Sequence, residues 1–409
     1  MTEVDDLLAD AALTMPQREE RLAAKWVRHA DRGAARALEV LLSAADPAAA
    51  ALAAGYLALL SGLRPEKQRA VESLAVRRGE WARAVVDLIK FLPPPAANLL
   101  LREVLETRND PSADSVLFEI ATYFPWLVQP FVEVIDDPLI GQTLLPGGPD
   151  DWARDFVQQF RDSEDPMFLQ ALVRMRTDAS RRALEELRAQ APSRMWPALD
   201  ASIENCGIFP NTGTPSYFPK SVLGFVVDRG GSPNRVGGGS AGQVPFCELC
   251  FTPTAHALTL SAGALGLRLA RDPSFYWFQC QHHDRDDEPL FVHLTDQGAE
   301  RLVIIQIGEP TSDGLPFVPG ERALALEHHP NQIGIGRDRL PGRGLHEVGG
   351  PPNWCRIDAF PRCPICQRGM HYLAALDGGM TPFGRIRIPG TLFMFWCDSC
   401  VVSATRLQR

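Results

Sequence analysis

Two sets of metal-ligand residues in the C-terminal half constrain the fold of this 409-residue chain more than any other feature. The downstream set consists of Cys363, Cys366, Cys397 and Cys400. The upstream set lies 116 to 117 residues earlier and consists of Cys247, Cys250, Cys280 and His283. Four cysteine or histidine ligands in two tight turns are what a closed tetrahedral zinc site requires. The sequence therefore predicts two structural zinc ions, and the matched spacing predicts an internal duplication.

The two copies also share the order of the segments around their ligands. In each copy a Cys-x-x-Cys turn precedes an apolar run, at 257–260 in the first and 370–373 in the second. An aromatic run then leads into the second turn, at 275–278 and at 393–396. A strand pair closed by two such turns is typical of a zinc ribbon. The spacing exceeds that of a minimal ribbon, so each pair is expected to decorate a larger sheet.

The upstream set has two candidates for its fourth ligand, because His282 stands next to His283 and competes with it. Zinc held by four protein ligands has no open position at which to activate water. The two sites are therefore expected to stabilise a fold rather than to catalyse. A redox function is disfavoured because no thioredoxin-like pattern surrounds either Cys-x-x-Cys pair. Cys206 and Cys355 have no partner at ligand spacing and are expected to be buried thiols.

Residues 1–205 are expected to be helical throughout. Apolar residues recur there at a spacing of three to four and are separated by short polar, glycine or proline breaks. A series of short helices indicates paired helices stacked as a HEAT-like or irregular solenoid, with a compact helical domain as the alternative. The breaks are expected near 31–33, 45–47, 63–65, 93–95, 109–111, 125, 137–138, 146–149 and 165–166.

After residue 205, glycine and proline become frequent and β-type runs appear, among them 222–227, 302–306 and 391–396. The expected fold class is therefore α+β. It combines a helical domain at 1–205 with a β-rich duplicated zinc-binding domain at 206–409, whose pseudo-repeats span about 206–325 and 326–409. The Gly/Ser-rich stretch 230–242 is expected to be a loop before the first Cys-x-x-Cys turn.

The charge distribution bears on partners and location. Residues up to Glu204 carry 32 acidic and 23 basic side chains, whereas the remainder carries 18 of each. A nucleic-acid platform needs a concentrated basic face, so this class of partner is disfavoured. The acidic N-terminus argues against a signal peptide, and the lack of a long apolar run argues against a membrane span. The expected location is therefore the cytoplasm. Abundant alanine and arginine with few lysines are typical of a high-GC bacterial genome.

Enzyme motifs are weak in this sequence. P-loop, His-Glu-x-x-His and dinucleotide-binding patterns are absent, and one formal Gly-x-Ser-x-Gly match at 238–242 lies in the Gly/Ser-rich loop. Glu327, His328 and His329 can be read as metal ligands or an acid/base pair. The favoured interpretation is that these three residues, at a strand end, are surface side chains or side chains that support a site without entering it. His371, in an apolar run, is expected to be a core histidine.

A family resemblance appears in residues 330–409. The run Val348-Gly-Gly-Pro-Pro-Asn-Trp354 is followed by Cys363-Pro-Ile-Cys366, Met370-His-Tyr-Leu373 and Leu392-Phe-Met-Phe-Trp-Cys397. It resembles the YwqG-like (DUF1963) proteins and the related programmed-cell-death-2 C-terminal domain. The segment 205–330 shares this only through the internal repeat, and the first 200 residues are not covered. Cys355-Arg356 departs from the glutamine usual after the tryptophan.

The resemblance implies a duplicated β domain that binds protein partners and brings no catalytic residues with it. Relatives look like chaperones of a nascent ribosomal protein or like immunity proteins that accompany toxins. The function expected is thus a non-catalytic, zinc-stabilised protein-interaction module that neutralises a toxin or chaperones a protein client. The alternatives are an enzyme with a cleft near Glu327, His328, His329 and Asp338, covered by the loop 230–242, or nucleic-acid binding through Arg337, Arg339, Arg343, Arg385 and Arg387.

Overall fold

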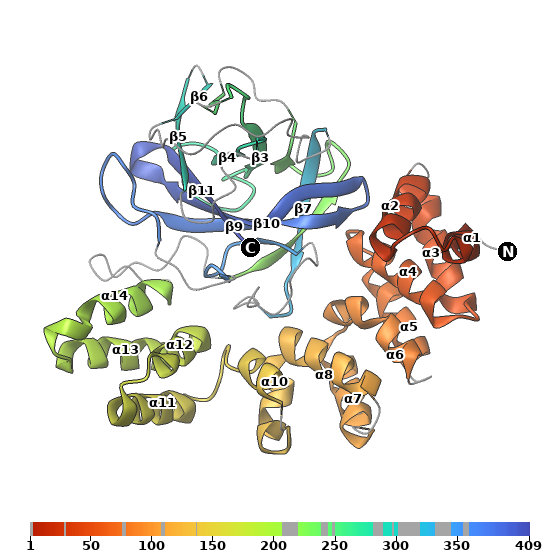
Figure 1. The fold of residues 1–409 in the computed structure, drawn as a ribbon, viewed down its shortest axis with the longest axis horizontal. Helices are drawn as coiled ribbons and strands as arrows, with labels where there is room; N and C mark the ends of the chain where they lie inside the picture. The colour runs from red at the N-terminus through yellow and green to blue at the C-terminus, as the bar shows by residue number, and fades with distance from the viewer. Residues whose placement is uncertain are drawn as a thin grey trace. The chain divides into compact units, whose positions relative to one another are not determined.

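The chain forms a helical unit and a sheet unit, which are drawn in the computed structural model of Figure 1. The helical unit comprises Met1–Gln190 with His329–Ile335 and Met380–Gly384. The sheet unit comprises Ala191–His328, Gly336–Gly379 and Arg385–Arg409. The α+β class predicted from the sequence is confirmed. The structure describes residues 3–27, 30–75, 79–107, 111–135, 137–206, 220–238, 244–247, 250–280, 289–296, 298–301, 320–331, 345–354 and 360–409.

The helices of the first unit begin largely where the sequence places breaks. Proline occupies the first turn of many of them, where its missing N–H is not needed. The carboxylates of Asp46 and Asp165 accept hydrogen bonds from the N–H groups of Ala48 and Met167, at 2.9 and 2.8 Å, and so cap two helices. The segments are α1 (Glu3–Ala9), α2 (Met15–Trp26), α3 (Ala30–Ser43), α4 (Pro47–Leu59), α5 (Arg64–Ala75), α6 (Glu80–Ala84), η2 (Val86–Phe91), α7 (Pro94–Glu106), α8 (Pro111–Tyr123), α9 (Pro125–Val128), η3 (Gln129–Val134), α10 (Pro138–Thr143), α11 (Asp150–Ser163), α12 (Pro166–Met175) and α13 (Asp178–Gln190). No helix among the described residues is both long and apolar enough to cross a membrane.

The break predicted near residues 31–33 lies a few residues earlier, because α2 ends at Trp26 and α3 begins at Ala30 and runs through Gly33. A Cβ atom at Gly33 would lie 2.7 Å from the carbonyl oxygen of Trp26 and 3.1 Å from the hydroxyl oxygen of Tyr56. The ring of Trp26 in turn packs edge-on against that of Tyr56, with centroids 5.0 Å apart. This glycine therefore permits a close helix contact and does not end a helix.

Replacing Gly33 with alanine should destabilise the helical unit by about 1–3 kcal/mol, because backbone atoms must move to admit the new methyl group. Gly55 of α4 is the matched control, since a Cβ there meets no described atom within 4 Å. Gly55→Ala should stabilise the unit by about 0.5–1 kcal/mol through helix propensity. Urea denaturation followed by far-UV circular dichroism measures both effects. Equal stabilisation by the two substitutions would show that Gly33 has no packing role.

His329 does not lie at the surface, which is one of the two places expected for it. It is fully buried in the helical unit, and its ring centroid lies 6.1 Å from that of Tyr123 of α8. Its Nδ1 accepts a hydrogen bond from the N–H of Asn331 at 3.0 Å, and the Asn331 side chain donates to the carbonyl of Thr122 at 3.2 Å. The segment 329–331 thus anchors to α8. His328 is exposed, as expected.

The second unit contains an eleven-stranded sheet in the order β4-β3-β2-β7-β1-β8-β9-β10-β11-β5-β6. The predicted strands at 222–227 and 391–396 are confirmed, whereas 302–306 lies outside the described residues. Both cysteine-bearing strand pairs belong to this sheet, and the segment 290–295 extends it beyond the C-terminal strand. The segments are η4 (Ser193–Met195), α14 (Trp196–Asn205), β1 (Val222–Val227), β2 (Arg235–Val236), β3 (Ala255–Thr259), β4 (Ser274–Trp277), β5 (Leu290–Thr295), β6 (Gly298–Arg301), β7 (Arg322–His328), β8 (His346–Val348), β9 (His371–Thr381), β10 (Gly384–Cys397), η7 (Asp398–Cys400) and β11 (Val402–Gln408).

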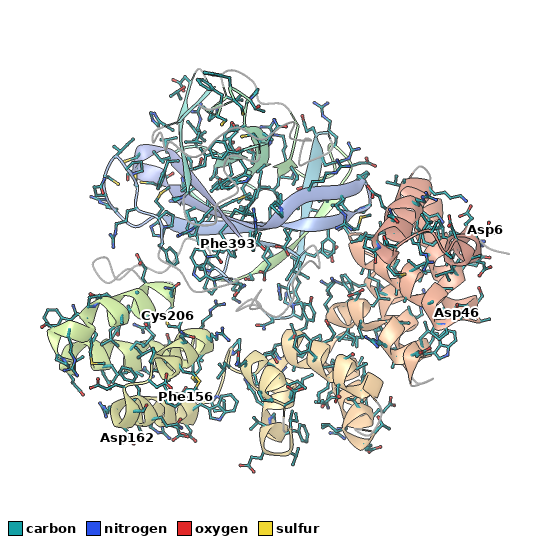
Figure 2. All side chains as sticks on the ribbon, viewed as in Figure 1. Asp6, Asp46, Phe156, Asp162, Cys206 and Phe393 are labelled. Atoms are coloured by element: carbon teal, nitrogen blue, oxygen red, sulfur yellow. The ribbon has the colours of Figure 1, made fainter. Side chains whose placement is uncertain are left out.

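An aromatic cluster forms the core on one face of β9 and β10, where Phe393 is labelled in Figure 2. The ring of Trp354 lies tilted against that of Phe393 and stacks on that of Phe395, with centroids 4.7 and 5.6 Å away. Cys363 and Cys397 belong to the same buried cluster. These two cysteines are therefore continuous with the hydrophobic core of the sheet.

Candidate metal centres

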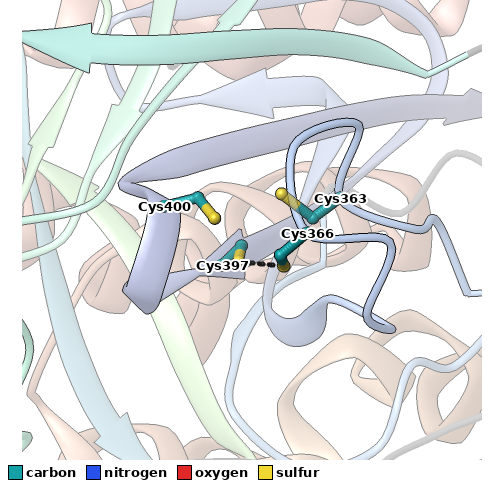
Figure 3. Close-up of side chains that lie close together, drawn as sticks. All are labelled: Cys363, Cys366, Cys397 and Cys400. Carbon is teal, nitrogen blue, oxygen red and sulfur yellow. Dashed lines mark hydrogen bonds between the residues drawn. The ribbon is translucent and has the colours of Figure 1, made fainter.

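Four cysteines from two separate turns converge beside this core and form what we call the four-cysteine cluster (Figure 3). Their Sγ atoms all lie within 4.8 Å of one another. One pair comes from the turn before β9, one ligand ends β10, and one ends η7. Two ligands are buried and two are half-buried. The members are Cys363, Cys366, Cys397 and Cys400.

The sulfur positions fit a tetrahedral zinc ion. Zinc–thiolate bonds of about 2.3 Å place the sulfur atoms of a regular tetrahedron about 3.8 Å apart. The Sγ atoms of Cys366 and Cys397 are 3.6 Å apart, which is close to that edge. Thiolate sulfur is a soft ligand that suits zinc rather than magnesium or calcium. The cluster can therefore hold a metal ion by protein ligands alone, without an open position.

The turn that presents the first two ligands of this cluster is a closed loop of backbone hydrogen bonds. The N–H of Cys363 donates to the carbonyl of Arg368 at 2.9 Å, and the N–H of Gln367 donates back to the carbonyl of Cys363 at 2.8 Å. The N–H of Met370 donates to the carbonyl of Pro361 at 2.9 Å. Gln367 adopts a left-handed conformation with φ of 60°. This geometry aims both sulfurs to the same side.

A three-cysteine cluster, formed by Cys247, Cys250 and Cys280, repeats this arrangement upstream. The N–H of Cys247 donates to the carbonyl of Thr252 at 2.9 Å, and the N–H of Phe251 donates to the carbonyl of Cys247 at 2.8 Å. Every donor and acceptor stands 116 residues before its counterpart in the downstream turn. Phe251 has the left-handed φ of 58° that corresponds to Gln367.

The three sulfurs of the upstream cluster also lie within 4.8 Å of one another. Both candidates for the fourth ligand, His282 and His283, lie outside the described residues. A disulfide or a simple pair of packed cysteines would bring only two thiols together, whereas three converge here. The donor set therefore fits a metal ion that a fourth ligand completes.

The environment of the thiols adjusts their acidity in both directions. Burial raises the pKa of Cys363 and of Cys397. Burial acts in the same direction on Cys366, but hydrogen bonds from the Arg368 backbone and from the other thiols outweigh it and lower its pKa to about 7. Burial also raises the pKa of Cys250. Hydrogen bonds with Thr252 outweigh this effect, so the pKa of Cys250 is lowered overall. A bound metal ion deprotonates its thiol ligands outright, so it would remove these differences.

The upstream turn exposes two aromatic side chains that its downstream counterpart replaces with polar ones. Phe246 and Phe251 are 52% and 72% exposed, and their rings stack with centroids 6.1 Å apart. Arg362 and Gln367 occupy the corresponding positions downstream. A phenylalanine in the left-handed region carries backbone strain of order 1–2 kcal/mol. The left-handed backbone belongs to the turn in both copies, whereas the exposed ring is found in the upstream turn alone.

Replacing Phe251 with asparagine should therefore stabilise the sheet unit, by about 0.5–1 kcal/mol, because asparagine tolerates a left-handed backbone. The metal content should stay unchanged, since the side chain is not a ligand. Thermal denaturation and elemental analysis of the purified variant test both expectations. Phe246→Ser serves as the control that removes an exposed ring without relieving strain. A loss of stability in Phe251→Asn would mean that the ring has a structural contact.

The remaining candidate residues do not gather with the clusters in the described part of the chain. Cys206 is half-buried after α14, rather than fully buried as expected. Glu327 and His371 are half-buried on β7 and β9. Cys355, Asp338, Arg337, Arg339, Arg343 and most of the Gly-x-Ser-x-Gly match lie outside the described residues.

Sequence reasoning missed Asp398, which directly follows Cys397 in the four-cysteine cluster. Its Oδ1 accepts hydrogen bonds from the indole N–H of Trp396 at 3.1 Å and from the N–H of Ala270 at 2.8 Å. An aspartate next to a cysteine ligand is a recognisable signal, but its partner Ala270 is 128 residues away. No pattern in the sequence indicates that partner.

The chain matches no family model, no curated protein and no solved structure in comparisons of these three kinds. The resemblance to the YwqG-like proteins accordingly depends on the quoted motifs alone.

Proposed function

We propose that this protein is a non-catalytic, zinc-stabilised module that binds a protein partner. The observation that carries the proposal is the stacked pair Phe246 and Phe251, which is exposed on a turn held by cysteine ligands. Aromatic side chains in a rigid setting are typical anchors of protein interfaces. A metal ion would fix that turn and so reduce the entropy lost on binding.

Zinc is the proposed metal in both clusters, with His283 or His282 as the fourth upstream ligand. The equal hydrogen-bond patterns of the two turns, offset by 116 residues, favour two zinc-ribbon-like pseudo-repeats that arose by duplication. In this account the upstream copy has gained phenylalanines and the downstream copy has kept polar residues. The upstream copy would then bind the partner, and the downstream copy would stabilise the core.

The partner class follows from the proposed resemblance to the YwqG-like and programmed-cell-death-2 C-terminal families. A toxin to be neutralised or a protein client to be chaperoned fits a binding surface without catalytic residues. The helical unit, whose sequence is acidic, would add a HEAT-like scaffold to the same partner or to a second one. A nucleic-acid ligand is disfavoured by the even charge of the cysteine-bearing half.

Affinity capture from an extract of the native host, with quantitative mass spectrometry, tests the proposal. The wild-type chain should retain a stoichiometric protein partner, and the double variant Phe246→Ser/Phe251→Asn should lose it while keeping its metal. Arg362→Ser/Gln367→Asn, the same changes in the downstream turn, is the matched control and should retain the partner. Equal capture by both double variants would contradict a role of the phenylalanine pair. Nucleic acid in the wild-type eluate, released by salt, would favour the alternative.

A further inference from the structure

The loop between β3 and β4 is fastened to the turn that carries two ligands of the four-cysteine cluster. The N–H of Ala270 donates to the Asp398 carboxylate at 2.8 Å. Asp398 lies between Cys397 and Cys400. Its position is therefore fixed when these two cysteines are fixed. The same carboxylate oxygen is held by the indole N–H of Trp396, which is completely buried.

The loop itself is closed by two hydrogen bonds and leads into the upstream cluster. The N–H of Ala262 donates to the Asp272 carboxylate at 2.8 Å, and the N–H of Leu260 donates to the carbonyl of Pro273 at 3.0 Å. Strand β4 follows directly and ends three residues before Cys280. The hydrogen bond to Asp398 thereby anchors one end of the hairpin whose other end supplies a ligand to the three-cysteine cluster.

A second attachment joins the same two regions. β5 pairs with β11, and the N–H of Leu294 donates to the carbonyl of Val401, directly after the last downstream ligand, at 3.0 Å. Within the upstream copy, Arg271, next to Ala270, donates through its guanidinium to the carbonyl of Thr295 of β5 at 2.8 Å and so joins the loop to that strand. The upstream copy is therefore tied to the downstream ligand turn on both sides of Cys280.

We propose that Asp398 is a positioning residue that couples the two clusters, so that metal binding by the four-cysteine cluster raises the metal affinity of the three-cysteine cluster. The inference rests on the proposed zinc sites. Metal orders the turn from Cys397 to Cys400, the ordered turn holds Asp398, and Asp398 holds the hairpin that presents Cys280. Such coupling is reciprocal, so metal in the upstream cluster strengthens binding downstream by the same factor.

Competitive titration with zinc and a chromophoric chelator tests the coupling in three forms of the full chain. Asp398→Ala should lower the affinity of the three-cysteine cluster about tenfold, the lower end of losses seen when a residue behind a metal ligand is removed. Asp398→Asn keeps an oxygen that accepts both hydrogen bonds and should bind as the wild type does. The same titrations in a Cys250→Ser background give the affinity of the four-cysteine cluster separately.

Ala270→Pro removes the donor of the same hydrogen bond and leaves the downstream turn unchanged. The test therefore does not depend on whether Asp398→Ala folds. It too should weaken zinc binding at the three-cysteine cluster about tenfold. Cobalt absorption spectra, which differ between three-thiolate and four-thiolate sites, assign each step to a cluster. An upstream affinity within twofold of the wild type in both Asp398→Ala and Ala270→Pro would overturn the coupling. A wild-type chain that takes up neither zinc nor cobalt would instead overturn the proposed metal sites, and the coupling with them.

Discussion

Replacing Cys397 with serine should unfold the sheet unit and leave the helical signal of the first unit in place. The Cys397 thiol is only 6% exposed and is both a cluster member and part of the aromatic core. Structural zinc contributes apparent binding free energies of about 10–16 kcal/mol, as much as or more than a whole domain's stability of about 5–15 kcal/mol. A sheet that depends on this ion cannot survive its loss.

Elemental analysis and two spectroscopic signals measure the outcome. The wild-type chain should contain two zinc ions. The variant should lose the near-UV circular dichroism of the sheet unit's buried tryptophans, Trp277, Trp354 and Trp396, and keep the far-UV helical intensity. Cys206→Ser is the matched control, because this half-buried cysteine belongs to neither cluster. It should keep both zinc ions and both signals. One zinc ion or none in the wild type, or a folded Cys397→Ser sheet without metal, would refute a structural role.

The convergence of the cysteines could be predicted from the sequence because the requirement is local. A metal turn needs two cysteines at a fixed spacing and a short loop between them, and both properties are visible in the run from Cys363 to Cys366. Strands next to those turns were predictable for the same reason, since apolar and aromatic runs directly adjoin the ligands. The helix starts at Pro47, Pro94 and Pro166 likewise follow from the residue itself.

Contacts between distant segments could not be predicted. Gly33 has the chemistry of a break, and its role depends on Tyr56 of another helix. His329 has the chemistry of a surface residue, and its burial depends on Tyr123. The order of the sheet, in which β5 follows β11, is a tertiary pairing without a periodic signal. Each of these misses concerns a partner that local propensity does not encode.

The Gly-Gly-Pro-Pro-Asn-Trp element shows how a motif read as a family mark has a structural explanation. The carbonyl of Gly349 accepts a hydrogen bond from the Ser221 hydroxyl at 3.3 Å, and a Cβ at Gly350 would collide with that serine. The side-chain amide of Asn353 donates to the fully buried carboxylate of Glu347, at 3.2 and 3.4 Å from its two oxygens. The element thus folds back on β1 and β8 and delivers the tryptophan that follows to the core.

Replacing that tryptophan, Trp354, with alanine should destabilise the sheet unit by about 3–5 kcal/mol, the usual cost of removing a buried aromatic ring. The ring is 6% exposed and packs against Phe360, Phe393 and Phe395. Its indole N–H also donates to the side-chain oxygen of Asn205, at the end of α14, at 2.6 Å. The variant therefore loses both core volume and the link to that helix.

Trp354→Phe separates the two contributions, because it keeps an aromatic ring and removes the N–H. Asn205 is 2% exposed, so its oxygen would be left buried without this donor, at a cost of about 1–3 kcal/mol. In a double-mutant cycle, Asn205→Ala should destabilise the wild type more than it destabilises Trp354→Phe. Urea denaturation of the zinc-loaded proteins gives the free energies of unfolding. Equal effects of Asn205→Ala in both backgrounds would show that the hydrogen bond contributes nothing to stability. A loss of stability below about 1 kcal/mol in Trp354→Ala would show that the ring is not part of a packed core.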